Sequence, residues 1–165
     1  MIYAGIGSRE TPKPFLDFMY LVGLHQGKFG HTLRSGNARG ADEAFMRGAI
    51  EADGRMEIYL PSPRFGAIQD DNFVSTIPEE AFEIAEQFHP KWGNVSDFGK
   101  RLMARNSMQV LGMDLKTPAD FIICYTHDGK ASGGTGQAIR IADAYNIPVF
   151  NLKDKEDYAL IKSIL

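Results

Sequence analysis

The chain has 165 residues, of which 44% are hydrophobic and 24% are charged, and its formal net charge at pH 7 is −3. This length can bury a sizeable core, so we expect a single domain over residues 1–165. The composition argues against two classes of protein: the acidic balance is unlike that of proteins that neutralise many duplex-DNA phosphates, and no run of about 18 apolar residues is present that could span a membrane.

Five short apolar runs predict β-strands, at residues 2–6, 31–35, 56–60, 120–125 and 147–151. The segments between and after them repeat apolar residues at helical spacing, which predicts helices over residues 14–28, 41–52, 78–88, 97–115, 137–145 and 155–164. Strands that alternate with helices favour a parallel sheet covered on both faces. We therefore predict a three-layer, Rossmann-like α/β domain whose sheet has about five parallel strands in the order 3-2-1-4-5.

Residues 61–95 interrupt this alternation. They hold four of the eight prolines and the only tryptophan, Trp92, around one acidic helical segment, PEEAFEIAEQF. We expect an irregular insertion here. Segments of this length in compact domains are often lids or binding loops, although many only cover the surface.

Glycine and small polar residues are dense in three of the predicted strand-to-helix loops, at residues 5–10, 35–42 and 126–137. The carboxyl ends of parallel strands meet at one edge of the sheet, where ligands bind beside the point at which strand order reverses. Glycine lets the backbone approach a ligand closely, and the free N–H groups at a helix N-terminus attract anions. Each loop alone could be only a tight turn or an ordinary helix start, but the three together predict a phosphate or nucleotide site.

The loop residues that we expect to bind the ligand share small size or polar character. Arg9 and Arg39 would add charge-assisted contacts to phosphate, and Asp42 would either stabilise the start of its helix or bond a ribose hydroxyl. The loop set is Gly7, Ser8, Arg9, Ser35, Gly36, Arg39, Asp42, Thr126, Gly133, Gly134, Thr135, Gly136 and Gln137.

Several common sites are absent from the sequence. No GxxxxGK[ST] motif occurs, and Gly5 and Gly7 are followed by Glu10 rather than by a third glycine, which argues against an NAD site. No Cys and His residues have the spacing of a zinc site, so we expect neither a metal nor a resident cofactor. The single cysteine, Cys124, rules out an internal disulfide, and with no signal-peptide pattern at Met1 we expect a cytoplasmic protein.

Taken together, the three loops resemble the SLOG superfamily, which includes the DprA/Smf recombination mediators, the LOG phosphoribohydrolases and the YspA-like proteins. GSRETP and LRSGNARGADEAF, after the first and second strands, are similar to elements of the DprA and YspA branches, and GGTGQAIRIA looks like the glycine-rich phosphate loop of the superfamily. Residues 104–138 also resemble small stand-alone DprA-like proteins of bacteriophages.

The resemblance implies roles for residues outside the loops. Arg105 is similar to an arginine of the LOG enzymes, which places Arg105 and its neighbour Asn106 among the expected ligand-binding residues. Arg140 stands where those enzymes have their catalytic glutamate. Whether the chain is an enzyme therefore stays open; if it is, we expect a nucleotide N-glycosidase that uses Glu10 or Asp42 as its carboxylate.

Three functions remain in competition at this point. The first is binding of a nucleotide or nucleotide-derived ligand, with or without cleavage of its N-glycosidic bond. The second is binding of single-stranded DNA by a minimal DprA-like core, and the third is a non-catalytic sensor or sponge for a nucleotide signal. Relatives in the superfamily commonly dimerise, so the resemblance also implies a homo-oligomer, with no membrane partner.

Overall fold

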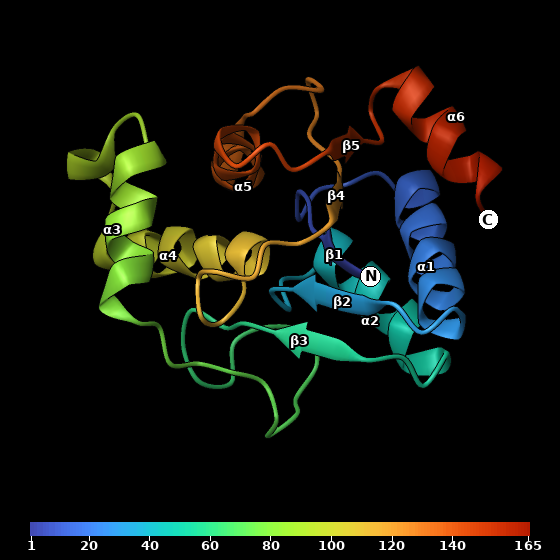
Figure 1. The fold of residues 1–165 in the computed structure, drawn as a ribbon, viewed down its shortest axis with the longest axis horizontal. Coiled ribbons are helices and arrows are strands. Elements are labelled where there is room, and N and C mark those ends of the chain that lie inside the picture. Colours follow the sequence, from blue (N-terminus) through green and yellow to red (C-terminus); the bar gives the residue numbers. More distant parts are fainter.

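The computed structural model describes residues 1–165, in which five β-strands alternate with six α-helices (Figure 1). The strands are Ile2–Gly5 (β1), Thr32–Ser35 (β2), Met56–Ile58 (β3), Phe121–Cys124 (β4) and Val149–Asn151 (β5). The helices are Lys13–Lys28 (α1), Ala41–Glu51 (α2), Glu79–Phe88 (α3), Asp97–Leu111 (α4), Gly133–Ala144 (α5) and Lys155–Ser163 (α6), with a short 3-10 helix at Trp92–Asn94. None of the helices has the length and apolar character needed to cross a membrane.

The sheet is parallel throughout and has the order β3-β2-β1-β4-β5, which confirms the predicted fold class and strand order. Strand β1 is central: Tyr3 pairs with Leu33 of β2 on one side and with Phe121 of β4 on the other. The direction in which the chain adds strands reverses between β1 and β4, so this is the point at which a ligand site is expected in such a sheet.

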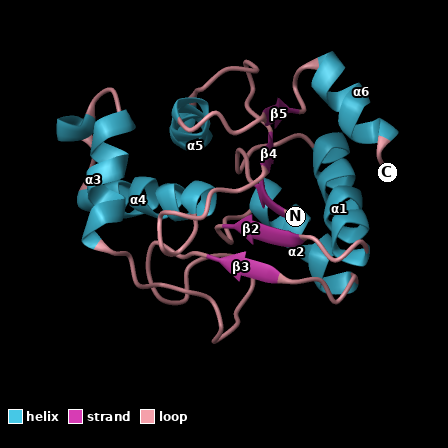
Figure 2. Cartoon of the chain, in the orientation of Figure 1, coloured by secondary structure: helices cyan, strands magenta, loops and turns pink.

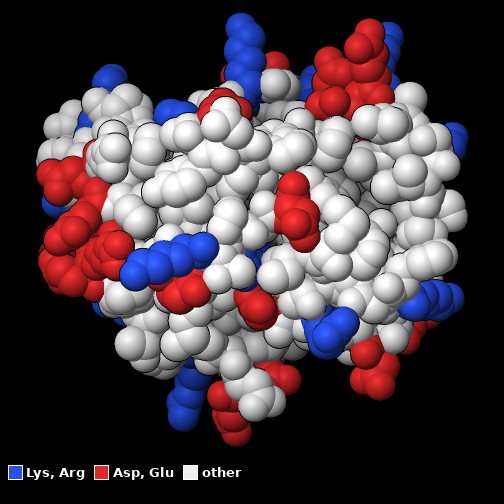
Figure 3. Space-filling view, viewed as in Figure 1, with Lys and Arg blue, Asp and Glu red and all other residues white.

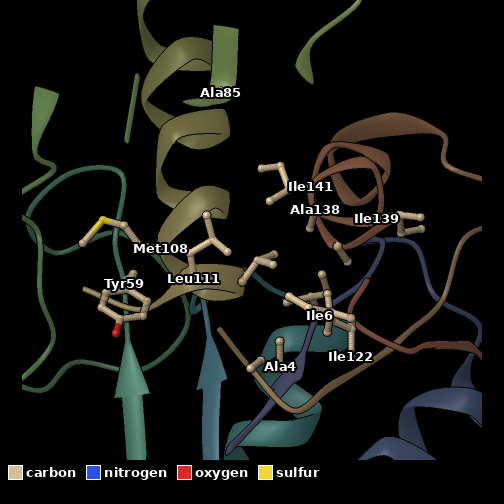
Figure 4. Packing of buried hydrophobic residues seen from close by; sticks show 14 of the residues in the cluster. Ala4, Ile6, Tyr59, Ala85, Met108, Leu111, Ile122, Ala138, Ile139 and Ile141 are labelled. Carbon is tan, nitrogen blue, oxygen red and sulfur yellow. The ribbon is translucent and has the colours of Figure 1, made fainter. Parts of the chain in front are cut away.

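Two hydrophobic layers enclose the sheet, because successive side chains of a strand point to opposite faces. Ala4 packs with side chains of α3, α4 and α5, whereas its neighbour Tyr3 packs with those of α1, α2 and α6. Figure 2 shows α1 and α6 grouped away from α3 and α4, and Figure 4 shows Leu111 of α4 and Ala138 of α5 meeting Ile122 of β4. Cys124 is fully buried in the same layer, where burial raises the pKa of its thiol to about 12.

Two helix boundaries differ by more than one residue from those that the sequence predicts. Helix α5 begins at Gly133, four residues before the predicted start, so GGTG forms the first turn of the helix rather than a loop that precedes it. Helix α4 ends at Leu111 rather than at residue 115, because Gly112 takes a left-handed conformation with φ of 85° and stops the helix. Propensity explains the first error, since glycine is a poor helix former and only packing makes it helical here.

Candidate functional site

A cleft of about 820 Å³ lies beyond the carboxyl ends of β1, β2 and β4. This volume is within the range of small-molecule binding sites. Many residues predicted from the sequence line this one cleft: Gly7, Ser8, Arg9, Glu10, Arg39, Asp42, Arg105, Asn106, Thr126, Gly133, Gly134 and Thr135. The structure therefore brings the three glycine-rich segments and helix α4 together at the predicted edge of the sheet.

The first two glycine-rich loops pack directly on each other and on the end of β4. The amide of Ser8 donates to the carbonyl of Tyr125 at 3.2 Å, and the Ser8 carbonyl accepts from the amide of Ala41 at 3.5 Å. Gly40 has φ of 90°, and a side chain there would come within 2.7 Å of the Arg9 backbone. A residue larger than glycine at this position would force the two loops apart.

Two helices begin at the cleft, α2 and α5, and neither has a side chain that caps its N-terminus. Ser132, at the N-cap of α5, donates its hydroxyl to Asp128 at 2.8 Å instead of accepting from the helix. The first N–H groups of a helix lack partners within the helix and carry a partial positive charge. Gly133 and Gly134 thus present uncapped backbone N–H groups at the cleft.

Arg105 supplies a full positive charge to the cleft although it is only 5% exposed. Its Nη1 donates to the carbonyl oxygens of Gly36 and Tyr59, and its Nε donates to Asn106 Oδ1 at 3.2 Å. Its Nη2 has no protein acceptor. Burial lowers the pKa of the guanidinium, and the charge of Asp42 opposes this shift. The group is held rigidly by the protein and keeps one edge free for an anion.

Asp42 is 4% exposed at the start of α2 and lines the same cleft. Burial raises the pKa of its carboxyl to about 6, and the Arg105 charge and the backbone N–H of Ala38 act in the opposite direction. The Ala38 amide, in the loop before α2, donates to Asp42 Oδ2 at 3.3 Å, so the carboxyl holds this loop against the start of the helix. A carboxyl group with this pKa can both give and take a proton near neutral pH.

Helix α4 adds two amide side chains to the floor of the cleft. Asn106 donates to the carbonyl of Gly134 at 2.9 Å and so ties α4 to the first turn of α5. Gln109 lies one turn beyond Arg105 and is 2% exposed, yet its amide makes no hydrogen bond to any protein group. Buried amides normally have partners, so Gln109 is a free donor and acceptor at the cleft.

Four residues of the predicted ligand set do not line the cleft: Ser35, Gly36, Gly136 and Gln137. Ser35 and Gln137 are fully buried, and their side chains donate to the carbonyls of Gly5 and Ala85. Gly36 uses its carbonyl to hold Arg105, and Gly136 packs against the backbone of Ala131. In the structure these four residues support the walls of the cleft rather than line it.

Several residues of the cleft were not expected from the sequence: Phe65, Phe98, Leu102, Met103, Gln109 and His127. Their helical spacing could have identified part of this set, because positions 98, 102, 105 and 109 fall on one face of a helix. The Nε2 of His127 lies 3.5 Å from Ser8 Oγ, across the gap between two loops.

Phe65 reaches the cleft because Asn37 holds residues 65–68 against the second glycine-rich loop. The Asn37 amide nitrogen donates to the carbonyls of Phe65 and Ile68, at 2.8 and 2.6 Å, and its Oδ1 accepts from the Ile68 amide at 3.0 Å. Asn37 itself has φ of 61°, a conformation that asparagine tolerates better than most residues. We call this arrangement the Asn37 clamp; it makes part of the 61–95 insertion a wall of the cleft.

No family model and no curated protein matches the sequence. Among solved structures, the chain is similar to DNA processing protein A from Helicobacter pylori, a protein described for its single-stranded DNA binding, with a TM-score of 0.60 at 16% identity over 99% of this chain and 80% of that one. It is also similar to two structures of the molybdenum cofactor carrier protein from Chlamydomonas reinhardtii, with TM-scores of 0.58 and 0.57 at 18% identity over 99% of this chain and 82% of each. At such low identity the likeness establishes that the chain has the fold of these proteins.

Proposed function

We propose that this chain is a SLOG-type protein that binds a phosphate-bearing nucleotide or nucleotide derivative in the cleft. The observation that carries the proposal is Arg105, a buried guanidinium with one free edge at the cleft. The uncapped start of α5 lies on the same cleft, so the cleft offers an anionic ligand both a full charge and backbone N–H groups. Arg9 and Arg39 are exposed at the rim and would add charge for attraction.

The structural neighbours support a binding role of this kind. One is described for binding single-stranded DNA, and the other is named as the carrier of a cofactor. Both neighbours align over nearly the whole of this chain, so the comparison includes the region of the cleft. The fold is therefore one that accommodates different ligands, and the choice among them depends on the residues of this chain.

The distribution of charge favours a small ligand over a long nucleic acid. Figure 3 shows isolated basic side chains on one face of the molecule, with acidic atoms gathered over α3 and α6, and no continuous basic stripe on this face. The net charge is −3. Binding of single strands depends on an extended positive groove with aromatic platforms, whereas one phosphate group needs only a local positive site.

Asp42 supports a second candidate function, cleavage of the N-glycosidic bond of the bound ligand. With a pKa of about 6, its carboxyl would be able to protonate the leaving base. The oxygen of a water molecule would then bond to the anomeric carbon, while the base departs with the bonding pair and the proton. Glu10, exposed on the cleft, is the other available carboxylate and would accept the proton from that water.

Thermal unfolding with nucleoside mono-, di- and triphosphates, cyclic nucleotides, ADP-ribose and oligo-dT, at low and high salt, tests the proposal. A ligand at ~100 times its dissociation constant stabilises the folded state by about 2.7 kcal/mol. We expect a small nucleotide to raise the Tm, and Arg9→Gln, Arg39→Gln and Arg105→Met to reduce this shift. Arg47→Met is the control, because Arg47 is exposed and pairs with Glu43 on α2.

The other outcomes separate the alternatives. A rise in Tm with oligo-dT alone that disappears at high salt would mean that the ligand is single-stranded DNA rather than a small nucleotide. No shift with any phosphate-bearing compound would overturn the proposal. Free base detected by chromatography, lost in Asp42→Asn or Glu10→Gln, would identify the chain as an N-glycosidase, whereas binding without product would identify a sensor or sponge.

A further inference from the structure

The face of α4 that lines the cleft changes character along the helix. Phe98 and Leu102, in its first half, are apolar, and Arg105 and Gln109, in its second half, are charged or polar. The apolar half is not sealed by the protein, since Phe98 is 46% exposed. The cleft therefore has a polar end, deep against the glycine-rich loops, and an apolar end near its mouth.

Two aromatic rings meet at this apolar end. The rings of Phe65 and Phe98 have centroids 6.2 Å apart with an angle of 48° between their planes. The guanidinium carbon of Arg105 lies 5.7 Å from the Phe65 centroid. The Phe65 ring thus lies close to both the Arg105 guanidinium and the ring of Phe98.

Backbone hydrogen bonds, rather than packing of its ring, hold Phe65 in position. Its backbone carbonyl is held by the Asn37 clamp, and its amide donates to the carbonyl of Ser62 at 3.3 Å. The ring is therefore presented by a fixed backbone and remains half-buried. A rigidly placed aromatic side chain loses little conformational entropy when it contacts a ligand.

The aromatic end and the start of α5 lie on different sides of α4. Met103 and Asn106 face α5: the Met103 Cε is 3.6 Å from the position that a Cβ on Gly134 would take, and Asn106 donates to the Gly134 carbonyl. Arg105 faces the other way, toward Gly36 and Phe65. A ligand with its phosphate at the start of α5 would thus extend across α4 toward the two phenylalanines.

We propose that Phe65 and Phe98 form a subsite for the planar heteroaromatic base of the ligand. The inference rests on the proposed function and deepens it, because it assigns a place in the cleft to the base of the nucleotide. Bases stack on aromatic side chains whatever their hydrogen-bonding edge, and such contacts account for a large share of base binding. A sugar phosphate without a base would leave the two rings without a contact.

Isothermal titration with adenosine, guanosine, cytidine and uridine monophosphate, ribose 5-phosphate and inorganic phosphate tests the subsite. We expect at least one nucleoside monophosphate to bind more tightly than ribose 5-phosphate. Phe65→Leu and Phe98→Leu keep an apolar side chain but remove the aromatic face. Each should therefore lower the affinity for that nucleotide by about 5- to 100-fold. Neither should change the affinity for ribose 5-phosphate or phosphate.

Phe29→Leu is the matched control, because Phe29 is 68% exposed beyond the end of α1 and does not line the cleft. Equal affinity for the nucleotides and ribose 5-phosphate, or nucleotide affinity unchanged in both cleft variants, would overturn the subsite and leave the proposed function standing. Failure of every compound to bind, phosphate included, would overturn the proposed function as well.

Discussion

At the scale of single residues, the floor of the cleft is unusual because two buried side chains keep polar groups without a protein partner and a third has a raised pKa. Asp42 has a raised pKa, Arg105 keeps a free Nη2, and Gln109 has no hydrogen-bond partner among protein groups. All three residues line the cleft, so a polar ligand that contacts them would complete their hydrogen bonding.

Gln109→Met tests whether the free amide of Gln109 serves ligand binding rather than stability. Methionine has a similar size without the polar amide, so we expect the variant to unfold at a higher temperature than the wild type and to bind nucleotide more weakly. Gln137→Met is the comparison, because the Gln137 amide donates to Ala85 and accepts from Arg140. That variant should lower the Tm; equal destabilisation by both substitutions would contradict the free state of the Gln109 amide.

The carboxyl of Asp42 predicts a pH dependence of stability. Its folded pKa of about 6 lies above the ordinary value of 3.8, so between these values the folded state binds more protons than the unfolded state. Its contribution to stability is present below about pH 4 and is lost as the pH rises through about 6, by roughly 3 kcal/mol at most.

Urea unfolding of the wild type and of Asp42→Asn at pH 4.5 and 7.5 measures this contribution. We expect the free energy of unfolding of the wild type, relative to that of the variant, to be lower at pH 7.5 by about 2 kcal/mol. A difference between the two proteins that does not change with pH would show that Asp42 ionises as an ordinary carboxyl.

At the scale of elements, the start of α5 decides the shape of the phosphate end of the cleft. The four residues GGTG form its first turn, and their glycines meet different surroundings. A Cβ on Gly134 would have only Met103 nearby, at 3.6 Å, whereas a Cβ on Gly136 would lie 2.4 Å from the Ala131 carbonyl carbon. Gly136 thus serves the close packing of the helix on the preceding loop, and Gly134 keeps the cleft open.

Substitution by alanine separates these two roles. Gly136→Ala should destabilise the protein by roughly 1–3 kcal/mol, because the Ala131 backbone has to move. Gly134→Ala should leave the free energy of unfolding within about 1 kcal/mol of the wild type, since alanine also favours the helix. Chemical denaturation of both variants checks the prediction. Equal losses in the free energy of unfolding would contradict the close packing of Gly136, and not of Gly134, on the backbone.

The elements also show how far the sequence could predict the site. The parallel sheet and the convergence of the three loops at one edge follow from the alternation of strands and helices, which is a local pattern. The roles of Ser35 and Gln137 could not be predicted, because both are polar residues in glycine-rich segments and only the fold buries them. Nothing in the sequence predicts that Phe65 lines the cleft, since its place there depends on hydrogen bonds to Asn37, 28 residues away.

At the scale of the whole molecule, the Asn37 clamp joins the 61–95 insertion to the sheet. Residues 65–68 hydrogen-bond to the second glycine-rich loop, and Val74 pairs with Tyr59 just beyond β3. The segment α3 then packs on α4 and α5 through Ala81 and Ala85. The insertion is thereby fixed at both ends, and the cleft depends on a segment that interrupts the strand–helix alternation.

Asn37→Asp should release the first part of this insertion without unfolding the sheet. Aspartate keeps the tolerance for positive φ but removes both amide donors. Hydrogen exchange should become faster over residues 65–68 and stay unchanged in β1 and β4, and nucleotide affinity should fall. Asn72→Asp is the control, because Asn72 bonds only within its own turn. Equal acceleration across the sheet would mean that Asn37 stabilises the fold as a whole.

The burial of Cys124 has a practical consequence for watching a ligand enter the cleft. Alkylating reagents attack the thiolate, and burial keeps this thiol both protonated and out of their reach. A cysteine introduced in place of His127, which is exposed and lines the cleft, would therefore be the only thiol that a maleimide dye could label. Cys124 does not have to be replaced before labelling, so a single substitution is enough to attach a fluorescent reporter at the cleft.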